Sequence, residues 1–594
     1  MLKNRFFFLS VEFVVLWLLF QIRYLYHFSY IEQYQLFLFG QDYLNKALQI
    51  PGGMAQYIGE FIVQFFYYPS IGAVVSALLI VVIQGFINET WNVLSRKASF
   101  YSFSLWIGLL LFLSVLDFNF LYKGIVCFLL LSIALYGYVF IRTVRCRLIY
   151  SILSILFLYY IASPIHLLFF LSIVGLELGR FYGLKNDRLE FEQFGLKSFL
   201  SLIVVNAVFL FILYEVSNIT TFRIFNSADG VYNPKLEAGF IQRLLWWSVP
   251  GLFLFYPILG RIARILQVRF GVFNVIQLVI VISLFFCFVG KYDDHTSLLS
   301  KKLDYYSARL QWDNVLEECK QTMITDHNAT SFALQNMALA NKGILADSLF
   351  HYPQNGSVGL VPEWGYSQYW AMLSSDICFL VGDMATARRY ALEGNIHSSS
   401  VGYPRNLKRL VDINLMYGEY AIAEKYISYL EKTLYYAEWA KEKRLYLYND
   451  NAVIYDEVLN RGRQRLAVKN HFFYTGDYLD ELKFYSKERS IKEPASQYLL
   501  CYYLLDKDIA SFSEALSKID LNDSEGLPVS MEEAVIICAQ NDVAVLSEYK
   551  VTKAGWTRFR KFVDWFKQQR EVPLLPSILK PEEMLNYWFY YQID

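Results

Sequence analysis

Long apolar stretches alternate with short polar segments through residues 1–290, and the rest of the chain lacks this pattern. A helix needs roughly 20 mostly apolar residues to cross about 30 Å of hydrocarbon. The pattern therefore predicts about nine membrane-spanning helices in the first half of the chain. They are expected near residues 6–27, 70–88, 100–118, 121–141, 148–163, 165–183, 198–216, 241–260 and 272–290.

The segment between the first two predicted spans, residues 28–68, has a different pattern. Residues 30–49 are amphipathic at helical spacing, and the turn-forming sequence Pro51-Gly52-Gly53 follows them. In the next stretch polar and small residues recur on one side of a helix, with large apolar residues opposite. The polar side holds Gln56, Gly59, Glu60 and Gln64, and the apolar side holds Ile58, Phe61, Ile62, Phe65 and Phe66. This pattern predicts a first outer loop built of surface helices that lie at the membrane interface.

Residues 291–594 have the polarity of a soluble protein and the apolar period of short helices. An internal repeat is visible at an offset of 36 positions: Ile377, Gly382, Ala387 and Tyr390 match Ile413, Gly418, Ala423 and Tyr426. This segment resembles tetratricopeptide repeats, whose period is about 34. Degenerate copies begin at Asp304 and Tyr474, and a generic helical bundle is the alternative. The sequence thus predicts an all-α protein, with a polytopic transmembrane helix bundle at 1–290 and a helical-repeat soluble domain at 291–594.

Composition adds a charge asymmetry to this division. The whole chain is 55% hydrophobic and has a formal net charge of zero. Residues 1–290 carry 20 Lys/Arg and 13 Asp/Glu, whereas the remainder carries 34 and 41. Neither half has the basic surplus of a nucleic-acid-binding protein, so nucleic acid is excluded as a partner. The seven cysteines occur singly and form no CxxC pair, so no zinc or thioredoxin-like motif is indicated.

Basic residues in the short loops predict an orientation. The first apolar stretch is too long for a signal peptide and has no small-residue cleavage site, so we expect an uncleaved anchor. With the N-terminus in the cytoplasm, nine spans place residues 291–594 outside it, at the bacterial cytoplasmic (inner) membrane. The cytoplasmic loops then carry Arg96, Lys97, Arg142, Arg145, Arg147, Arg180, Lys185, Arg188, Lys197, Arg261, Arg264 and Arg269.

The predicted outer loops hold an unusual set of polar residues. Ionisable groups at membrane depth are costly and point to function, whereas those at span ends are cheaper. Each also has a structural interpretation, as a solvated helix face, a cap or, for Asp117 with Lys123, a hairpin ion pair. The candidates are Glu32 and Asp42 for catalysis, and Glu60, Lys123 and His166 for substrate binding. The chain has no Walker loop, GxSxG, HExxH or Rossmann glycine pattern.

The chain resembles an uncharacterised family of bacterial polytopic membrane proteins with a C-terminal repeat region. The segments that carry the resemblance are Glu32-Gln33, Pro51 to Tyr57, Phe61 to Phe66, Pro69 with Gly72-Ala73, Asn336 to Ala340 with Gly343, and Leu349 to Gln354. This resemblance implies a family without implying an activity.

The first half also resembles multi-span glycosyltransferases (GT-C type) that use lipid-linked sugar donors, which have an acidic residue in an outer loop of surface helices after the first span. Glu32 occupies that place, with Asp42 as the other candidate. The resemblance implies that this carboxylate acts as a base on an acceptor, or binds a divalent cation at the donor phosphate. The sequence itself identifies no cofactor or metal site, and it lacks the adjacent acidic pair of that family.

Two functions lead from the sequence, and a transporter is the third alternative. One is a membrane glycosyltransferase-like enzyme that acts on a lipid-linked substrate at the outer face of the cytoplasmic membrane, with the lipid bilayer and a lipid-linked sugar as partners. The alternative is a non-enzymatic membrane scaffold whose repeat domain binds an envelope protein. We favour the enzyme because nine spans exceed what anchoring requires.

Overall fold

The computed structural model is helical and divides into two compact units. It describes residues 2–95, 101–183, 196–216, 228–255, 270–290, 294–360, 368–396, 398, 401–466, 478–487, 489–521, 526–541, 545–570 and 586–592. The first unit comprises Met1–Asp294 with Lys432–Tyr435, and the second comprises His295–Glu431 with Tyr436–Asp594. The sequence predicted a domain boundary between residues 290 and 291. In the structure the main boundary between the two units falls between residues 294 and 295. No β-strand longer than an isolated bridge occurs in these described ranges.

The first unit contains a helix at each of the nine predicted spans. Three basic loops used to predict the orientation, 96–100, 184–195 and 256–269, lie wholly or largely outside the described residues. The helices are α1 (Leu2–Arg23), α2 (Leu25–Tyr34), α3 (Gln41–Gln49), α4 (Gly53–Val63), η1 (Gln64–Tyr67), α5 (Pro69–Ser95), α6 (Tyr101–Val115), α7 (Tyr122–Val139), α8 (Val144–Ala162), α9 (His166–Gly183), α10 (Leu196–Val216), η2 (Ala228–Val231), α12 (Phe240–Leu254) and α14 (Phe270–Val289).

Four helices in the described part are long and apolar enough to cross a membrane. They contain the stretches Pro69–Val93, Tyr122–Val139, Val144–Ala162 and Leu196–Glu215. A bent pair, Phe7–Arg23 with Leu25–Tyr34, makes a fifth if it is counted as one broken span. By this criterion of length and composition, the described residues contain four to five apolar helices able to span a membrane, and the number nine stays a prediction.

The helix of the first predicted span ends in a sharp bend that the apolar pattern did not predict. α1 and α2 meet at Tyr24 with a bend of 81°. α2 ends at Tyr34, a non-helical stretch follows, and α3 begins at Gln41. The loop predicted at 28–68 therefore consists of α2, α3, α4 and the short η1, in place of one amphipathic helix over 30–49.

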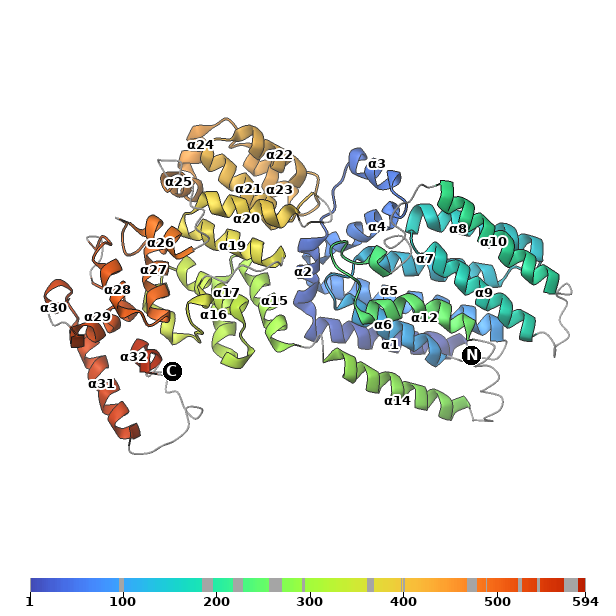
Figure 1. Cartoon of the computed structure of the whole chain (residues 1–594), viewed down its shortest axis with the longest axis horizontal. Coiled ribbons are helices and arrows are strands. Elements are labelled where there is room, and N and C mark those ends of the chain that lie inside the picture. Colours follow the sequence, from blue (N-terminus) through green and yellow to red (C-terminus); the bar gives the residue numbers. More distant parts are fainter. Residues whose placement is uncertain are drawn as a thin grey trace. The chain divides into compact units, whose positions relative to one another are not determined.

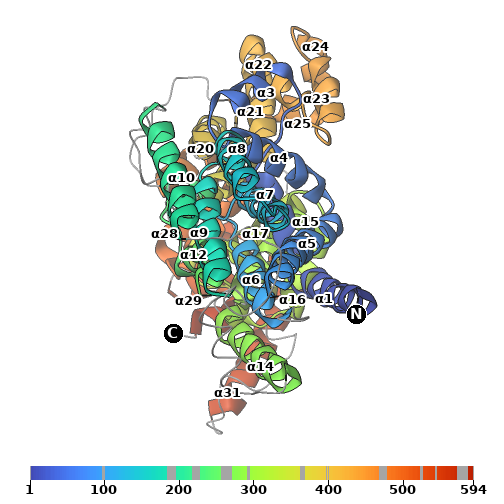
Figure 2. The ribbon, with the colours of Figure 1, turned by 90° about the vertical axis from the view of Figure 1, so that its right-hand side faces the viewer.

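The long helices of the first unit form one bundle. α5 packs against α6 and α7, and α12 packs against α6 and α9. Figure 1 shows these helices from the side, and Figure 2 shows several of them nearly end-on. α4 packs across the N-terminal end of α7 and the C-terminal end of α8. We call this the loop end of the bundle, because the α6–α7 turn, the α8–α9 turn and the segment 24–68 meet there.

The second unit consists of shorter helices, many of them arranged as antiparallel neighbours (Figure 1). They are α15 (His295–Ser307), α16 (Trp312–Gln321), η3 (Ile324–Asp326), α17 (Ala329–Asn341), α18 (Leu345–Ser348), η4 (Leu349–His351), η5 (Ser357–Gly359), α19 (Gln368–Val381), α20 (Met384–Ile396), α21 (Pro404–Tyr417), α22 (Tyr420–Leu430), α23 (Ala437–Arg444), α24 (Asp450–Tyr455), α25 (Glu457–Gln464), α26 (Tyr478–Ser486), α27 (Pro494–Leu505), α28 (Ile509–Leu516), α29 (Val529–Asn541), α30 (Val545–Glu548), α31 (Lys553–Arg570) and α32 (Tyr587–Gln592).

The two segments related by the offset of 36 residues are both helical hairpins. Gly382 separates α19 from α20 with φ of +101°, and Gly418 separates α21 from α22 with φ of +74°. Glycine adopts this backbone region readily, which allows a helix to end and the chain to reverse. The copy beginning at Tyr474 falls mostly outside the described residues, and assignment to tetratricopeptide repeats stays a prediction.

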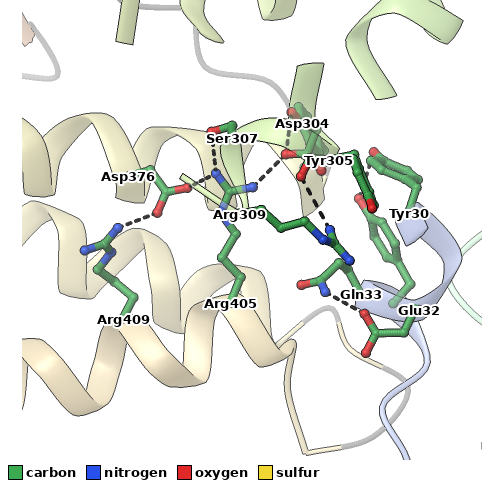
Figure 3. Close-up of polar contacts among 12 residues, drawn as sticks. Tyr30, Glu32, Gln33, Asp304, Tyr305, Ser307, Arg309, Asp376, Arg405 and Arg409 are labelled. Atoms are coloured by element: carbon green, nitrogen blue, oxygen red, sulfur yellow. Dashed lines mark hydrogen bonds and ion pairs between the residues drawn. The ribbon is translucent and has the colours of Figure 1, made fainter. Parts of the chain in front are cut away.

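A buried ion-pair network joins three helices of the second unit (Figure 3). Arg405 on α21 lies 2.6 Å from Asp304 on α15 and 2.5 Å from Asp376 on α19. Arg409 contacts Asp376 at 2.7 Å, and the Tyr369 hydroxyl donates to Asp304 at 3.1 Å. These contacts fix how the first helical hairpin packs against the second and against α15.

Candidate functional site

Glu60 lies on α4 and is 3% exposed, although its helix was predicted to lie on the membrane surface with its polar side outward. Its carboxylate accepts hydrogen bonds from the Tyr43 hydroxyl on α3 and from Gln56 Nε2 at 2.9 Å. The polar residues of α4 thus face the protein, whereas the ring of Phe61 is 39% exposed. The predicted amphipathic helix is present as α4, but its polar side packs against the protein.

Close packing brings α4 against the start of α7. A Cβ atom at Gly59 would lie 2.6 Å from the backbone nitrogen of Lys123, so the position accommodates only glycine without a shift. The charge of Lys123 acts on Glu60 across this contact. Burial raises the pKa of Glu60 to about 7, while the two hydrogen bonds and Lys123 act in the opposite direction. Two predicted binding residues, Glu60 and Lys123, are therefore brought together.

The segment after α2 is tied to the same end of α7. Gln35 accepts a hydrogen bond from the backbone N–H of Tyr122 at 3.1 Å through Oε1. The Tyr122 hydroxyl lies 2.5 Å from Ser76 Oγ on α5. Sequence reasoning missed Gln35 and Tyr43, because nothing in the local pattern shows which helix they contact.

The turn between α8 and α9 forms another part of the loop end. The backbone N–H of Gly52 donates to Tyr160 O at 2.8 Å, and a Cβ at Gly52 would lie 2.3 Å from Ser163 O. His166, the third predicted binding residue, is buried at the first position of α9, and its ring lies 5.3 Å from that of Tyr159. The Pro51-Gly52-Gly53 turn therefore packs α4 against the turn that carries His166.

Several buried polar atoms at the loop end have no hydrogen-bond partner within the described ranges. They are Gln35 Nε2, Gln64 Oε1, Ser163 Oγ and His166 Nδ1. A buried polar atom without a partner costs about 1–3 kcal/mol. Four such atoms at one end of a helix bundle are the arrangement expected where a polar ligand or ordered water completes the bonding.

The two predicted catalytic carboxylates lie in different surroundings. Asp42 is exposed in the first turn of α3, a helix with no buried residue. Glu32 is 3% exposed on α2 and accepts a hydrogen bond from Gln33 Nε2 at 2.6 Å (Figure 3). Glu60, which the sequence assigned to binding, is likewise 3% exposed and accepts hydrogen bonds from side chains on α3 and on its own helix.

Asp117 was predicted to pair with Lys123, and its hydrogen bonds go elsewhere. Oδ2 accepts from the Tyr232 hydroxyl at 2.8 Å and from Gln242 Nε2 at 3.1 Å. Asp117 therefore fastens the α6–α7 turn to the segment before α12, which is a structural role. A sequence pairing based on neighbouring positions could not identify partners more than 100 residues away.

A second buried charge cluster lies at the opposite end of the bundle and was not anticipated. Glu177 Oε1 accepts from the Tyr138 hydroxyl at 2.9 Å and pairs with Arg180 at 2.9 Å and Arg147 at 3.4 Å. Both arginines were assigned to cytoplasmic loops, yet both are largely buried. The sequence feature that could have indicated this cluster is the single carboxylate of Glu177 inside the apolar stretch 165–183. The cluster fixes α7, α8 and α9 relative to one another.

Across the parts of the chain that the structure describes, no three His, Cys, Asp or Glu side chains come together in a group that could hold a metal ion. The described side chains at the loop end include the buried carboxylate of Glu60, Lys123, His166 and the three amides of Gln35, Gln56 and Gln64.

Comparison with known proteins gives a family and no activity. Residues 2–594 match a family of unknown function, DUF6057. The chain belongs to this family. The match extends over both units, and it agrees with the resemblance to an uncharacterised family. No curated protein and no solved structure matches the chain. The proposals for this member of DUF6057 therefore rest on its own residues.

Proposed function

We propose that this protein is a membrane-embedded transferase that acts on a lipid-linked substrate at the outer face of the cytoplasmic membrane. The observation that carries the proposal is the buried carboxylate of Glu60, which Tyr43 and Gln56 orient where α4 packs against the start of α7, at the backbone of Lys123. A group transfer from a lipid-linked donor needs a base for the acceptor and positive charge at the leaving phosphate. The loop end of an apolar helix bundle offers both at a place a lipid can reach.

Glu60 is assigned the role of base. Two donors, Tyr43 and Gln56, hold its carboxylate in one orientation, and its pKa of about 7 lies close to physiological pH. A base is most effective when its pKa is near the working pH. The resemblance placed this role on Glu32, and the geometry favours Glu60 because it combines burial, a nearby cation and oriented donors.

Lys123 is assigned to the leaving group, and His166 to the polar part of the substrate. Lys123 follows the turn into α7 and supplies a positive charge beside Glu60. The unpartnered Nδ1 of His166 can accept or donate one hydrogen bond, depending on its protonation. The proposal includes no metal ion, because the contacts that carry it are those of Glu60, Lys123 and His166.

The test is a mass profile of lipids and envelope glycans in a deletion strain. The strain is complemented with wild type, Glu60→Gln, Glu32→Gln or Asp42→Asn, each at matched protein level in the membrane. Glu60→Gln keeps the shape and removes the base, so we expect the same accumulated lipid-linked precursor as in the deletion. Asp42→Asn alters an exposed carboxylate on the adjacent helix and serves as the matched control, with a wild-type profile expected.

Each outcome separates the alternatives. A wild-type profile with Glu60→Gln removes the assigned base, and loss with Glu32→Gln alone moves the role to that residue. A deletion that changes neither lipids nor glycans contradicts the transferase. The scaffold whose second unit binds an envelope protein would then become the leading function.

A further inference from the structure

The helix α3 is attached to the first unit in an unusual way. It runs from Gln41 to Gln49 and has no buried residue, although it lies directly before the buried helix α4. Its sequence is strongly amphipathic: Tyr43, Leu44, Ala47 and Leu48 share one side, and Gln41, Asp42, Asn45, Lys46 and Gln49 share the other. Part of its apolar side is therefore not covered by the first unit.

Both ends of α3 are marked by glycines with a positive φ. Gly40 precedes the helix with φ of +152°, and Gly52 follows it with φ of +79°. Glycine lowers the energetic cost of backbone rotation at such positions. The Gly52 end is anchored, since its N–H donates to Tyr160 O on α8. α3 is thus a short helix between two potential hinge points, and the chain beside each is hydrogen-bonded to the first unit, at Gly52 to Tyr160 O and before Gly40 from the Phe39 N–H to Lys432 O.

Tyr43 is the residue that connects α3 to the candidate site. Its hydroxyl donates to Glu60, and its ring lies 5.9 Å from the rings of both Phe37 and Tyr57. The remaining apolar residues of α3 and its C-terminal end point elsewhere: Leu48 is 55% exposed and Ile50 is 58% exposed. One part of the apolar side therefore covers Glu60, and the other is free to contact another apolar phase.

The exposed apolar part of α3 continues onto a helix that is long and apolar enough to span a membrane. Ile50 lies two residues before Gly52, which is bonded to Tyr160 of α8. α8 exposes a row of large apolar side chains at Ile149, Leu153, Phe157 and Tyr160. In a bilayer this row faces lipid, so the surface formed by Leu48 and Ile50 is an extension of a lipid-facing surface. Short amphipathic helices commonly lie at this depth with the apolar side in the acyl boundary.

We propose that α3 is an amphipathic lid that docks its exposed apolar residues on the lipid bilayer and covers the Glu60 site through Tyr43. Docking on the bilayer is independent of the proposed transferase, while the role of the lid in substrate entry rests on it. A lid held by the membrane would admit a lipid-borne substrate from the side and separate Glu60 from bulk water.

The docking is tested in the full-length protein in lipid nanodiscs, with the exposed Cys146 and Cys287 replaced by serine. A nitroxide label is attached at Leu48→Cys or, as the matched control, at Asn45→Cys on the polar side of the same helix. Power saturation with oxygen, which partitions into lipid, and with a water-soluble nickel chelate reports the surroundings of each label. We expect an oxygen-to-nickel ratio several-fold higher at position 48 than at position 45.

Two results would overturn the docking. Equal and low oxygen-to-nickel ratios at the two positions would place the whole helix in water, and equal and high ratios would place both of its sides in lipid, which contradicts the proposed orientation. A label at 48 shielded from both reagents would show that protein, such as a second copy of this chain, covers the surface in place of lipid. Neither readout depends on enzymatic activity, so a failure here is distinguishable from a failure of the transferase proposal.

The lid contact is tested in the Asn45-labelled protein. Tyr43→Phe removes the hydroxyl that donates to Glu60, and Tyr57→Phe removes a hydroxyl from the adjacent ring as the control. We expect the nanosecond mobility of the label to increase with Tyr43→Phe and to stay unchanged with Tyr57→Phe. Unchanged mobility in both variants would contradict the assignment of Tyr43 as the tie that holds the lid closed.

Discussion

Removing the Arg405 guanidinium should destabilise the second unit in a pH-dependent way. Arg405→Met keeps most of the apolar stem and leaves the buried carboxylates of Asp304 and Asp376 without the cation between them. Taking one partner from a buried ion pair typically costs 3–5 kcal/mol. Arg409 and Tyr369 still contact these carboxylates, so the lower end of that range, about 3 kcal/mol, is expected.

The sign of the pH dependence follows from Asp304. Burial raises the pKa of Asp304 above its ordinary value, and Arg405 acts to lower it. A carboxyl whose folded pKa is raised stabilises the fold when protonated, below its unfolded pKa, and this contribution is lost as pH rises through the folded pKa. Without Arg405 the folded pKa of Asp304 rises further. The loss of stability caused by Arg405→Met is therefore largest at neutral pH and decreases as the solution is acidified.

Hydrogen exchange followed by mass spectrometry of the full chain measures this cost locally. A loss of about 3 kcal/mol corresponds to roughly hundredfold faster exchange of the slowest amides in α21 at neutral pH. Arg389→Met is the matched control, since Arg389 forms an exposed i,i+4 pair with Glu393 that should contribute less than about 1 kcal/mol. Adding Asp304→Asn to Arg405→Met should recover part of the loss. A deficit below about 1 kcal/mol, or one that does not change with pH, would refute this account of the network.

Two further predictions concern packing and the C-terminal helix. Gly59→Ala places a methyl group against the backbone of Lys123 and should lower the free energy of unfolding by about 1–3 kcal/mol. Gly251→Ala, with open space around the added methyl group, should be neutral or stabilising in the same thermal unfolding measurement. Equal effects of the two substitutions would contradict the close contact at Gly59. Glu533 accepts the N–H of Tyr587 at 2.8 Å, and burial raises its pKa to about 7. The contribution of Glu533 to stability is present at low pH and lost as pH rises through about 7. Hydrogen exchange in α32, corrected for the intrinsic rate, should therefore speed up between about pH 6 and 8, and Glu533→Gln should abolish that pH dependence. A pH dependence that persists in Glu533→Gln would assign it to another group.

The apolar pattern was sufficient to predict the helices of the first unit, because the length of an uninterrupted apolar stretch is a local property. Each of the nine predicted spans coincides with a helix, from α1 to α14. The two Gly-centred hairpins at Gly382 and Gly418 were likewise visible, since a helix that reverses direction at a positive φ favours glycine. In both cases the residues that decide the structure are neighbours in the chain.

Only the tertiary structure decided which side of α4 packs against the protein. Its alternation of polar and apolar sides is plain in the sequence, but the pattern does not say which side meets protein and which meets the surroundings. In water the polar side would face out, whereas in a bundle surrounded by lipid the apolar side can face out and the polar side can be buried. Gly59 and Glu60 are buried while Phe61 is exposed, so the polar side of α4 is the side that packs against the protein.

The contacts of the candidate site depend on positions far apart in the sequence. Lys123 lies at the start of α7, which α4 crosses at Gly59, and Tyr43 reaches Glu60 because the chain turns back after α3. Asp117 was assigned the wrong partner for the same reason, as its hydrogen bonds come from Tyr232 and Gln242. The sequence determined which segments are helical and apolar, because those properties are local. Only the packing of distant helices decided which carboxylate is buried beside a cation, because that depends on contacts between residues the chain keeps apart.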